Sequence, residues 1–529
     1  MHDGVPVDGG ARMSKPVVVW VELAACSGCS VSFLDNHDSV GRILEAIDLR
    51  YDTLIIDGRD IPDHIDLAIV EGGVAITDKQ IELVRCIRRR SDVVVAMGAC
   101  AETGGVLNYA EGNQMPMPEL DAYLPLHDLI EVDYVLPGCP PASEAIAKFF
   151  EAYLDKDWAY LAPYNTIKGK SEGKIRDIVK MGLCVSCGLC GATCPTNAIR
   201  FVEGKPVIRD ERCIICGECY FQCPRSFLRL EERDPGTPNG SVGPYLEAYQ
   251  MRTTSSTLRR AAQSGGIVTT LFTYALDNNL IDGVIAAKKS EESVWMGDPY
   301  IATTPEELLA TTGTKYSVCP TLNYLRDAVT THGLGKLGIV GLPCQHEALK
   351  KLDDYPLGLR HISDKIALKV GLFCTSNFRY NAMTKMVEEV GGVRPEDIRK
   401  IDIGAGSFNI SALTGELIKI PLDVVHNYEQ ESCKICPDFT SEYADISVGS
   451  IGADEHWSTV FVRTQRGKEI LDGAVENGYI DSRELPENAL KLVGKIAASK
   501  RKKGARYLAT RKDYGLLIPF RYVETDSST

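Results

Sequence analysis

The chain has 529 residues, of which 44% are apolar and 25% are charged. These are ordinary globular proportions, so they exclude collagen-like, mucin-like and wholly disordered chains, and the length indicates several domains. The formal net charge of -14 argues against a nucleic-acid-binding protein, because phosphate binding needs concentrated lysine and arginine. No apolar run approaches the roughly 20 residues of a membrane-spanning helix, and no signal-like N-terminal segment is present. We therefore expect a soluble, cytoplasmic protein with no membrane span and no nucleic-acid partner.

Residues 1–15 are rich in glycine and lack periodicity, which predicts a disordered tail. Residues 16–155 alternate between short apolar runs and amphipathic stretches, which is typical of a mostly parallel, doubly wound sheet. The fold class is therefore α/β multidomain, with a flavodoxin-like first domain. The expected strands are Val17–Val21, Thr53–Ile56, Leu67–Val70, Val93–Met97 and Val132–Leu136, and the expected helical stretches are Val31–Ile47, Asp78–Arg90 and Ala142–Leu154.

Cysteines follow directly after the first, fourth and fifth of these strands. Parallel strands end at one edge of the sheet, so the four thiols are expected to converge there and to hold a 4Fe-4S cluster. The alternative, that small buried cysteines only pack, remains open and suits Cys86 on the helical stretch better. A carboxylate such as Asp57 or Asp60 could also replace one thiolate. We call these four residues the sheet-edge thiols: Cys26, Cys29, Cys100 and Cys139.

The segment 176–230 contains the spacing C-x2-C-x2-C-x3-C-P twice, with an offset of 29 residues. This pattern is typical of a bacterial two-cluster ferredoxin, in which the last cysteine of each run binds the other cluster. Zinc ribbons or disulfides are the alternatives. The first ferredoxin set is then Cys184, Cys187, Cys190 and Cys223, and the second ferredoxin set is Cys213, Cys216, Cys219 and Cys194.

Residues 244–505 predict a third, mixed α/β domain, followed by a C-terminal tail over 506–529. Two apolar runs, Lys336–Val340 and Ile366–Leu372, read as buried strands, and each is followed by a cysteine. A Cys-x-x-Cys pair lies further along the chain, so the four thiols together predict one more 4Fe-4S cluster, with a zinc site or a redox dithiol as alternatives. We call these residues the pocket thiols: Cys344, Cys374, Cys433 and Cys436. Cys86 and Cys319 are then left without a role.

The first part of the chain resembles the small subunit of nickel-iron hydrogenases. With its ferredoxin extension it is similar to the gamma subunit of coenzyme F(420)-reducing hydrogenase. The resemblance implies a proximal 4Fe-4S cluster on the sheet-edge thiols, facing a separate large subunit that holds nickel and iron. It rests on Glu22-Leu-Ala-Ala-Cys26-Ser-Gly-Cys29-Ser, Gly98-Ala-Cys100-Ala, Gly104-Gly105 and Leu136-Pro-Gly-Cys139-Pro-Pro141.

The third part resembles the beta subunit of the same hydrogenase, so two normally separate subunits are joined in one polypeptide. This resemblance implies FAD, one 4Fe-4S cluster on the pocket thiols, and the deazaflavin coenzyme F(420) as substrate. It rests on Ser264-Gly-Gly266, Thr312-Gly-Thr-Lys315-Tyr316, Leu342-Pro-Cys344-Gln345, Asp438-Phe-Thr440, Ala444-Asp-Ile-Ser-Val-Gly-Ser-Ile-Gly452 and Trp457-Ser-Thr459.

The flavin is expected to bind where glycines open a helix, because backbone amides there can approach a phosphate. Ser264-Gly-Gly266 precedes the helical stretch Ile267–Leu280, although a plain N-cap is the alternative. The basic run Lys500–Lys503 with Arg506 could attract the glutamates of the deazaflavin, but we favour a solvated helical face. The candidate flavin residues are Ser264, Gly265, Gly266, Thr314, Lys315, Tyr316, Asn377, Gly449, Ser450, Trp457, Ser458 and Thr459.

These features predict the electron-transfer and F(420)-reducing subunit of a cytoplasmic nickel-iron hydrogenase, acting within a larger oligomer. Four 4Fe-4S clusters pass single electrons to FAD, which passes them as hydride to F(420), so no side chain is catalytic in the usual sense. Two alternatives remain. The chain could be an F(420)-oxidising subunit of a heterodisulfide reductase or of another redox complex, or it could be a non-catalytic iron-sulfur protein that only transfers electrons.

Overall fold

The computed structural model describes residues 15–57, 60–110, 123–166, 175–226, 240–291, 295–355, 359–404, 406–514 and 516. The chain divides into two compact units, one of residues 1–172 with 214–217 and one of residues 173–213 with 218–529. The predicted N-terminal tail, apart from residue 15, lies outside the described residues. Among the described helices, none is both long enough and apolar enough to cross a membrane.

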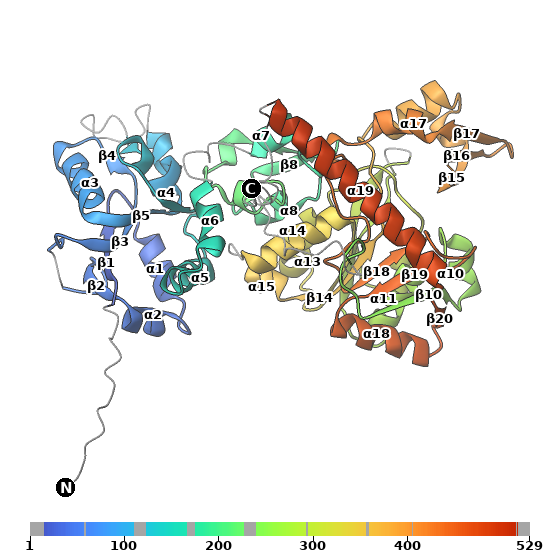
Figure 1. The fold of residues 1–529 in the computed structure, drawn as a ribbon, viewed down its shortest axis with the longest axis horizontal. Helices are drawn as coiled ribbons and strands as arrows, with labels where there is room; N and C mark the ends of the chain where they lie inside the picture. Colours follow the sequence, from blue (N-terminus) through green and yellow to red (C-terminus); the bar gives the residue numbers. More distant parts are fainter. Residues whose placement is uncertain are drawn as a thin grey trace, which may run out of the picture. The chain divides into compact units, whose positions relative to one another are not determined.

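The first unit is built on a five-stranded sheet in the order β2-β1-β3-β5-β7, and every pair of neighbours is parallel (Figure 1). Its strands are β1 (Val17–Glu22), β2 (Asp48–Tyr51), β3 (Ile65–Glu71), β5 (Ser91–Met97) and β7 (Tyr134–Leu136), with a small β4–β6 pair (Val74–Ala75 and Tyr123–Leu124) beside them. Its helices are α1 (Gly28–Leu34), α2 (Val40–Ala46), α3 (Asp78–Arg90), α4 (Gly98–Thr103), α5 (Ser143–Leu154) and α6 (Trp158–Thr166).

Aromatic packing fixes helices α1 and α5 against the first strand. Trp20 of β1 lies 5.5 Å from the ring of Phe33 in α1 and 6.3 Å from that of Phe150 in α5. All three side chains are almost completely buried. The alternating pattern of residues 16–155 is thus confirmed as a parallel sheet with connecting helices.

Two sequence predictions in this unit are wrong. Thr53–Ile56 is not a strand, because Asp52 accepts hydrogen bonds from the amides of Leu54 (2.6 Å) and Ile55 (2.7 Å) and so turns the chain. The strand lies just before this turn, as β2. The expected helix Val31–Ile47 is two helices, α1 and α2, separated by residues 35–39.

The second unit contains an eight-stranded mixed sheet in the order β12-β11-β13-β14-β18-β19-β10-β20. The run from β11 to β18 is parallel, and the remaining neighbours are antiparallel. The strands are β10 (Glu247–Thr253), β11 (Gly283–Lys289), β12 (Gly297–Ala302), β13 (Leu337–Gly341), β14 (Ile366–Leu372), β18 (Ile446–Gly449), β19 (Ser458–Val462) and β20 (Ile480–Glu484).

Smaller elements surround this sheet. The ferredoxin segment contributes one hairpin, and a separate antiparallel sheet of three strands packs on its own apolar cluster around Phe378 and Phe408. The hairpin is β8 (Ile199–Val202) and β9 (Lys205–Ile208), and the three-stranded sheet is β15 (Ile398–Gly404), β16 (Ser407–Ala412) and β17 (Leu417–Pro421). The helices are α7 (Ile175–Lys180), α8 (Leu189–Thr193), α9 (Glu218–Phe221), α10 (Ser256–Ala261), α11 (Ile267–Asp277), α12 (Pro305–Leu309), α13 (Leu325–Thr330), α14 (Pro343–Asp354), α15 (Arg360–Ser363), α16 (Ala382–Lys385), α17 (Leu422–Val425), α18 (Gln465–Glu476) and α19 (Glu487–Asp513).

Helix α19 connects distant parts of the second unit (Figure 1). Its N-terminal half packs through Val493 and Ala497 on a cluster that includes Phe461 of β19. Near its other end, the guanidinium of Arg511 donates a hydrogen bond to the carbonyl oxygen of Met181, in the ferredoxin segment, at 3.0 Å. The predicted tail over 506–529 is therefore wrong for residues 506–513, which are helical and packed, whereas residues 517–529 lie outside the described residues.

Candidate metal and flavin sites

The sheet-edge thiols meet at the carboxyl ends of the parallel strands, as predicted. The thiol of Cys29 interacts electrostatically with Cys100, Cys139 and Cys26. Glycine allows the close approach: a Cβ at Gly98 would lie 2.6 Å from the Cys29 sulfur, and Gly98 has φ +79°. The largest charge acting on Cys29 other than these thiols is Glu71, rather than the alternative carboxylates Asp57 or Asp60.

Glu71 holds the loop that carries two of these thiols. Its carboxylate is almost fully buried and accepts hydrogen bonds from the amides of Cys29 (3.1 Å) and Ser30 (3.0 Å). It also accepts from the Ser30 hydroxyl (2.7 Å) and the Trp20 indole (3.2 Å). Glu71 is therefore a positioning residue that caps the start of helix α1.

The electrostatics of the sheet-edge thiols favour a bound cation. Burial, reinforced by Glu71, raises the pKa of Cys29 well above its usual range, and burial followed by Cys139 and Cys26 raises the pKa of Cys100 to about 11. Such a crowded set cannot become four thiolates unless positive charge compensates it. A thiolate-ligated iron cluster supplies that charge, so the residues fit the group.

The thiols of the ferredoxin segment are grouped as the predicted exchange of the last cysteines requires, and their role as ligands stays a prediction. Burial raises the pKa of Cys187 to about 12, with Cys223 the next cause and Cys184 also contributing. Burial raises the pKa of Cys219 too, and the next largest contributions to this shift come from Cys194 and Cys213. Cys223 thus lies with the first run and Cys194 with the second. Cys216 belongs to residues 214–217 of the first unit, so its membership of the second ferredoxin set stays a prediction.

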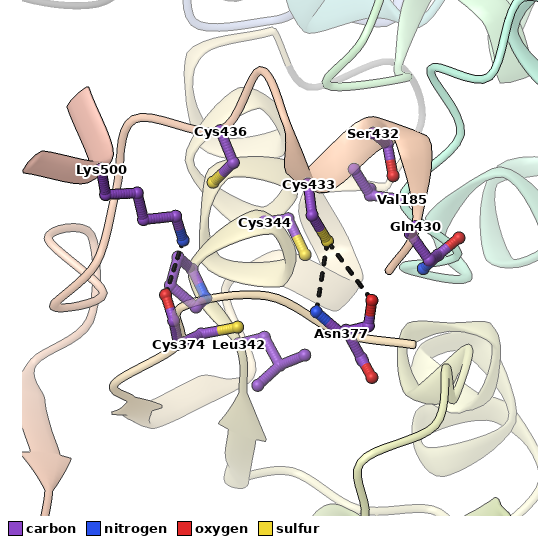
Figure 2. A pocket seen from close by; sticks show the side chains of 11 residues that line it. Val185, Leu342, Cys344, Cys374, Asn377, Gln430, Ser432, Cys433, Cys436 and Lys500 are labelled. Carbon is purple, nitrogen blue, oxygen red and sulfur yellow. Dashed lines mark hydrogen bonds between the residues drawn. The ribbon is translucent and has the colours of Figure 1, made fainter. Parts of the chain in front are cut away.

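The pocket thiols surround a cavity in the second unit. Figure 2 shows their sulfur atoms turned toward a common space. Burial raises the pKa of Cys374 to about 12 and that of Cys433 to about 11, and neighbouring thiols of the set contribute to both shifts. The amide of Asn377 donates a hydrogen bond to the Cys433 sulfur at 3.3 Å. The cavity is lined by Val185, Leu342, Pro343, Cys344, Cys374, Asn377, Gln430, Ser432, Cys433, Cys436 and Lys500.

The sequence predicts that Lys500 lies on a solvated helical face, and this prediction is wrong, because its side chain points toward the pocket thiols. Its Nζ donates a hydrogen bond to the carbonyl oxygen of Cys374 at 2.5 Å (Figure 2). It donates another to the carbonyl oxygen of Asp438 at 2.7 Å. Burial alone would lower the pKa of Lys500, but the thiols Cys436, Cys374 and Cys433 raise it above its usual value. The sequence does hold a feature that could have indicated this. The small and apolar residues of α19 recur at a helical spacing that puts position 500 on the buried face.

The start of helix α11 meets strand β19, which brings some of the candidate flavin residues together. The hydroxyl groups of Ser264 and Ser458 lie 3.0 Å apart, and the Gly265 amide donates to the Ser458 hydroxyl at 3.1 Å. Gly266 has φ +74°, a conformation that favours glycine. Trp457 is stacked beside Arg252 and Arg483, whose guanidinium carbons lie 4.6 and 4.0 Å from its ring centre.

Other candidate flavin residues make different contacts. Lys315 donates to the carbonyl oxygens of Thr311 (2.6 Å), Thr312 (2.9 Å) and Gly313 (3.2 Å), and burial lowers its pKa to about 8. Tyr316 packs in the aromatic cluster of the three-stranded sheet, 6.1 Å from Phe408. Asn377 lines the thiol cavity, Gly449 lies against Phe373, and Thr459 donates to the Ile451 carbonyl at 2.8 Å. None of these contacts involves Ser264 or Ser458.

Four families match consecutive parts of the chain. The NADH ubiquinone oxidoreductase 20 Kd subunit family matches residues 26–153, and the 4Fe-4S dicluster domain matches residues 183–227. The N-terminal and C-terminal families of the coenzyme F(420) hydrogenase/dehydrogenase beta subunit match residues 248–326 and 334–488.

Individual relatives also match either the gamma-like or the beta-like part of this chain. The beta subunit of coenzyme F(420) hydrogenase from Methanococcus voltae is 40% identical over 280 residues, which cover 53% of this chain and 99% of the relative. The gamma subunit from the same organism is 37% identical over 210 residues, which cover 36% of this chain and 86% of the relative. A chain of the F(420)-reducing [NiFe] hydrogenase complex from Methanosarcina barkeri is 35% identical, with a TM-score of 0.51 over 54% of this chain and 97% of that chain. The chain therefore belongs to the coenzyme F(420) hydrogenase/dehydrogenase family, and it joins regions similar to the gamma and beta subunits of the hydrogenase in one polypeptide.

Proposed function

We propose that this chain is the electron-transfer and F(420)-reducing subunit of a nickel-iron hydrogenase. In this proposal, electrons from hydrogen oxidation in a separate large subunit reach four 4Fe-4S clusters held by this chain. The observation that carries the proposal is the grouping of thiols inside regions that are similar to both the gamma and the beta subunit.

Each domain would hold a different part of the electron-transfer path. The first unit, whose strand order supports a flavodoxin-like arrangement, would place the sheet-edge thiols toward the large subunit. The ferredoxin segment would carry the next two clusters. The pocket thiols would hold the last cluster, inside the same unit as the proposed flavin site.

FAD, when bound, would supply the conversion between single electrons and a hydride, since clusters carry one electron at a time and a deazaflavin accepts two. The best-supported place for it is the junction of Ser264–Gly266 with Ser458. The hydroxyl groups there, with Gly265 and Gly266, form a polar turn at the start of an 11-residue helix. Arg252 and Arg483 beside Trp457 would attract an anionic ligand, although Asp481 and Asp454 also pair with them.

The test is to purify the native assembly without oxygen and to measure iron, nickel and flavin per chain. The proposal expects nickel only when a large subunit co-purifies, one flavin per chain, and hydrogen-dependent reduction of F(420). An assembly that has iron and flavin but neither nickel nor hydrogen oxidation would contradict it.

A second candidate function is supported by the family description, which covers dehydrogenases as well as hydrogenases. In that case the chain would oxidise reduced F(420) and feed a different redox partner, with the first unit as a docking module. Stoichiometric flavin with no nickel, together with cluster reduction by reduced F(420), would favour this candidate.

A further inference from the structure

Arg225 lies in the second unit between the first ferredoxin set and the pocket thiols. It follows Cys223-Pro224 and its side chain is completely buried. Its main-chain amide donates a hydrogen bond to the Cys223 sulfur at 3.4 Å. The largest charges acting on its guanidinium, after Glu347, are the thiols Cys436, Cys344 and Cys223. Arg225 therefore contacts Cys223 through its main chain, and its guanidinium lies within electrostatic range of the pocket thiols Cys436 and Cys344.

Helix α14 holds Arg225 in this position. Cys344, one of the pocket thiols, lies in its first turn, and Glu347 lies three residues later on the same face. The carboxylate of Glu347 accepts a hydrogen bond from Nη1 of Arg225 at 2.8 Å, and both side chains are buried. A turn further along, Lys351 donates to the Cys223 carbonyl oxygen at 2.6 Å. The helix face thus runs from one group of thiols to the other.

The pairing with Glu347 uses only part of the guanidinium. Nε and Nη2 of Arg225 are buried and have no hydrogen-bond partner among the described residues. An arginine cannot lose its charge in a protein, and buried N–H donors without acceptors are costly. Because the nearby charges are those of cysteine sulfurs, the missing acceptors are best supplied by sulfur atoms of a cluster.

We propose that Arg225 donates N–H···S hydrogen bonds from Nε and Nη2 to the cluster of the pocket thiols, and thereby raises its reduction potential. One-electron reduction adds one negative charge to such a cluster, and N–H donors with a fixed positive charge stabilise it. Because its main chain also contacts Cys223, Arg225 is a positioning residue between two successive clusters. This inference rests on the proposed function, which supplies both clusters.

The test uses the full-length chain with its clusters and measures reduction potentials by redox titration followed by electron paramagnetic resonance. Cys436→Ser first identifies the signal that belongs to the pocket thiols. Two variants then probe Arg225. Arg225→Lys keeps the charge but lacks the forked donors, whereas Arg225→Met with Glu347→Met removes both members of the buried pair together. Arg360→Gln, at an exposed position of helix α15, is the control for loss of a surface arginine.

We expect both Arg225 variants to shift the identified signal to a lower potential while iron content stays at the wild-type value. The double variant should lower the affinity for the electron at least tenfold, which is about 59 mV for a one-electron couple. Arg360→Gln should change no signal. Unchanged potentials with full iron content, or loss of this cluster in both Arg225 variants, would show that Arg225 only supports the fold. If Cys436→Ser removes neither iron nor a signal, the cluster assignment of the proposed function fails instead.

Discussion

The ammonium group of Lys500 donates a hydrogen bond to the main-chain carbonyl oxygen of Cys374 at 2.5 Å, across 126 residues of sequence. It binds the Asp438 carbonyl as well, at 2.7 Å. Lys500 therefore holds together two loops that carry pocket thiols, and it brings a positive charge beside them.

We predict that Lys500→Met lowers the iron content of the chain by the share of one cluster. The variant loses two charge-assisted hydrogen bonds, so the free energy of unfolding should fall by about 2 kcal/mol. Lys502→Met, on the exposed side of the same helix, is the matched control and should leave both quantities unchanged. Iron analysis and thermal unfolding check this, and equal iron in both variants would show that Lys500 is dispensable for the site.

Gly98→Ala should disable the sheet-edge thiols selectively. The added Cβ would lie 2.6 Å from the Cys29 sulfur, and the backbone at φ +79° strains any residue with a side chain. We expect loss of one cluster by iron analysis, with the ferredoxin signals retained. Gly41→Ala is the control, because a Cβ there meets nothing within 4 Å and alanine favours helix α2 by about 1 kcal/mol. A full complement of iron in Gly98→Ala would disprove the convergence of these thiols on a metal.

Glu71→Ala should destabilise the first unit. Four donors converge on this buried carboxylate, and removing it leaves them unpaired at a cost of about 3 kcal/mol or more. Thermal unfolding should show the loss, and the cluster of the sheet-edge thiols should become labile to chelators. Glu45→Gln, at an exposed position of helix α2, should behave like the wild type. The same chelator resistance in Glu71→Ala and in the wild type would contradict the positioning role.

Cys187→Ala should remove one ferredoxin cluster and stop electron flow to the flavin, while hydrogen activation by the partner continues. An open corner makes a cluster labile and shifts its potential. Hydrogen-dependent reduction of F(420) and iron content are the measurements. Cys86→Ala, on helix α3 away from the predicted sets, should change neither. Normal F(420) reduction by Cys187→Ala would remove this cluster from the electron path.

The features of the fold and of the candidate sites that could be predicted from the sequence are those that depend on short stretches of the chain. Strand β14 has the predicted bounds because its apolar run is short and uninterrupted. The match of residues 183–227 to a 4Fe-4S dicluster domain follows from cysteine spacings of two and three residues. The sheet-edge thiols needed one further rule, that parallel strands end together.

The remaining features depend on contacts between distant segments. Lys500 looks like part of a solvated basic run until helix α19 is placed over the pocket thiols. The ring of Tyr316 packs beside Phe408, a contact that its local sequence does not indicate, and its role in flavin binding stays a prediction. Asp52 ends strand β2 early through two side-chain hydrogen bonds, an effect that hydrophobic pattern does not record. Arg225 gives no sequence signal at all, because its partner Glu347 is 122 residues away.

The place of strand β10 in the eight-stranded sheet has a consequence for biosynthesis. β10 pairs with β19 and β20, which are the last strands to be synthesised in the part of this unit that the structure describes. Its partner β19 begins at Ser458, roughly 200 residues after β10 ends at Thr253, and at about 5–20 residues per second this corresponds to about 10–40 s of translation. During that interval both edges of β10 lack their native neighbours and can pair with other strands. The surroundings of the pocket thiols also stay incomplete until Lys500 has been added, because Lys500 bonds to the loops of Cys374 and Asp438. The cluster proposed for these thiols can therefore take its final surroundings only after position 500 has been synthesised.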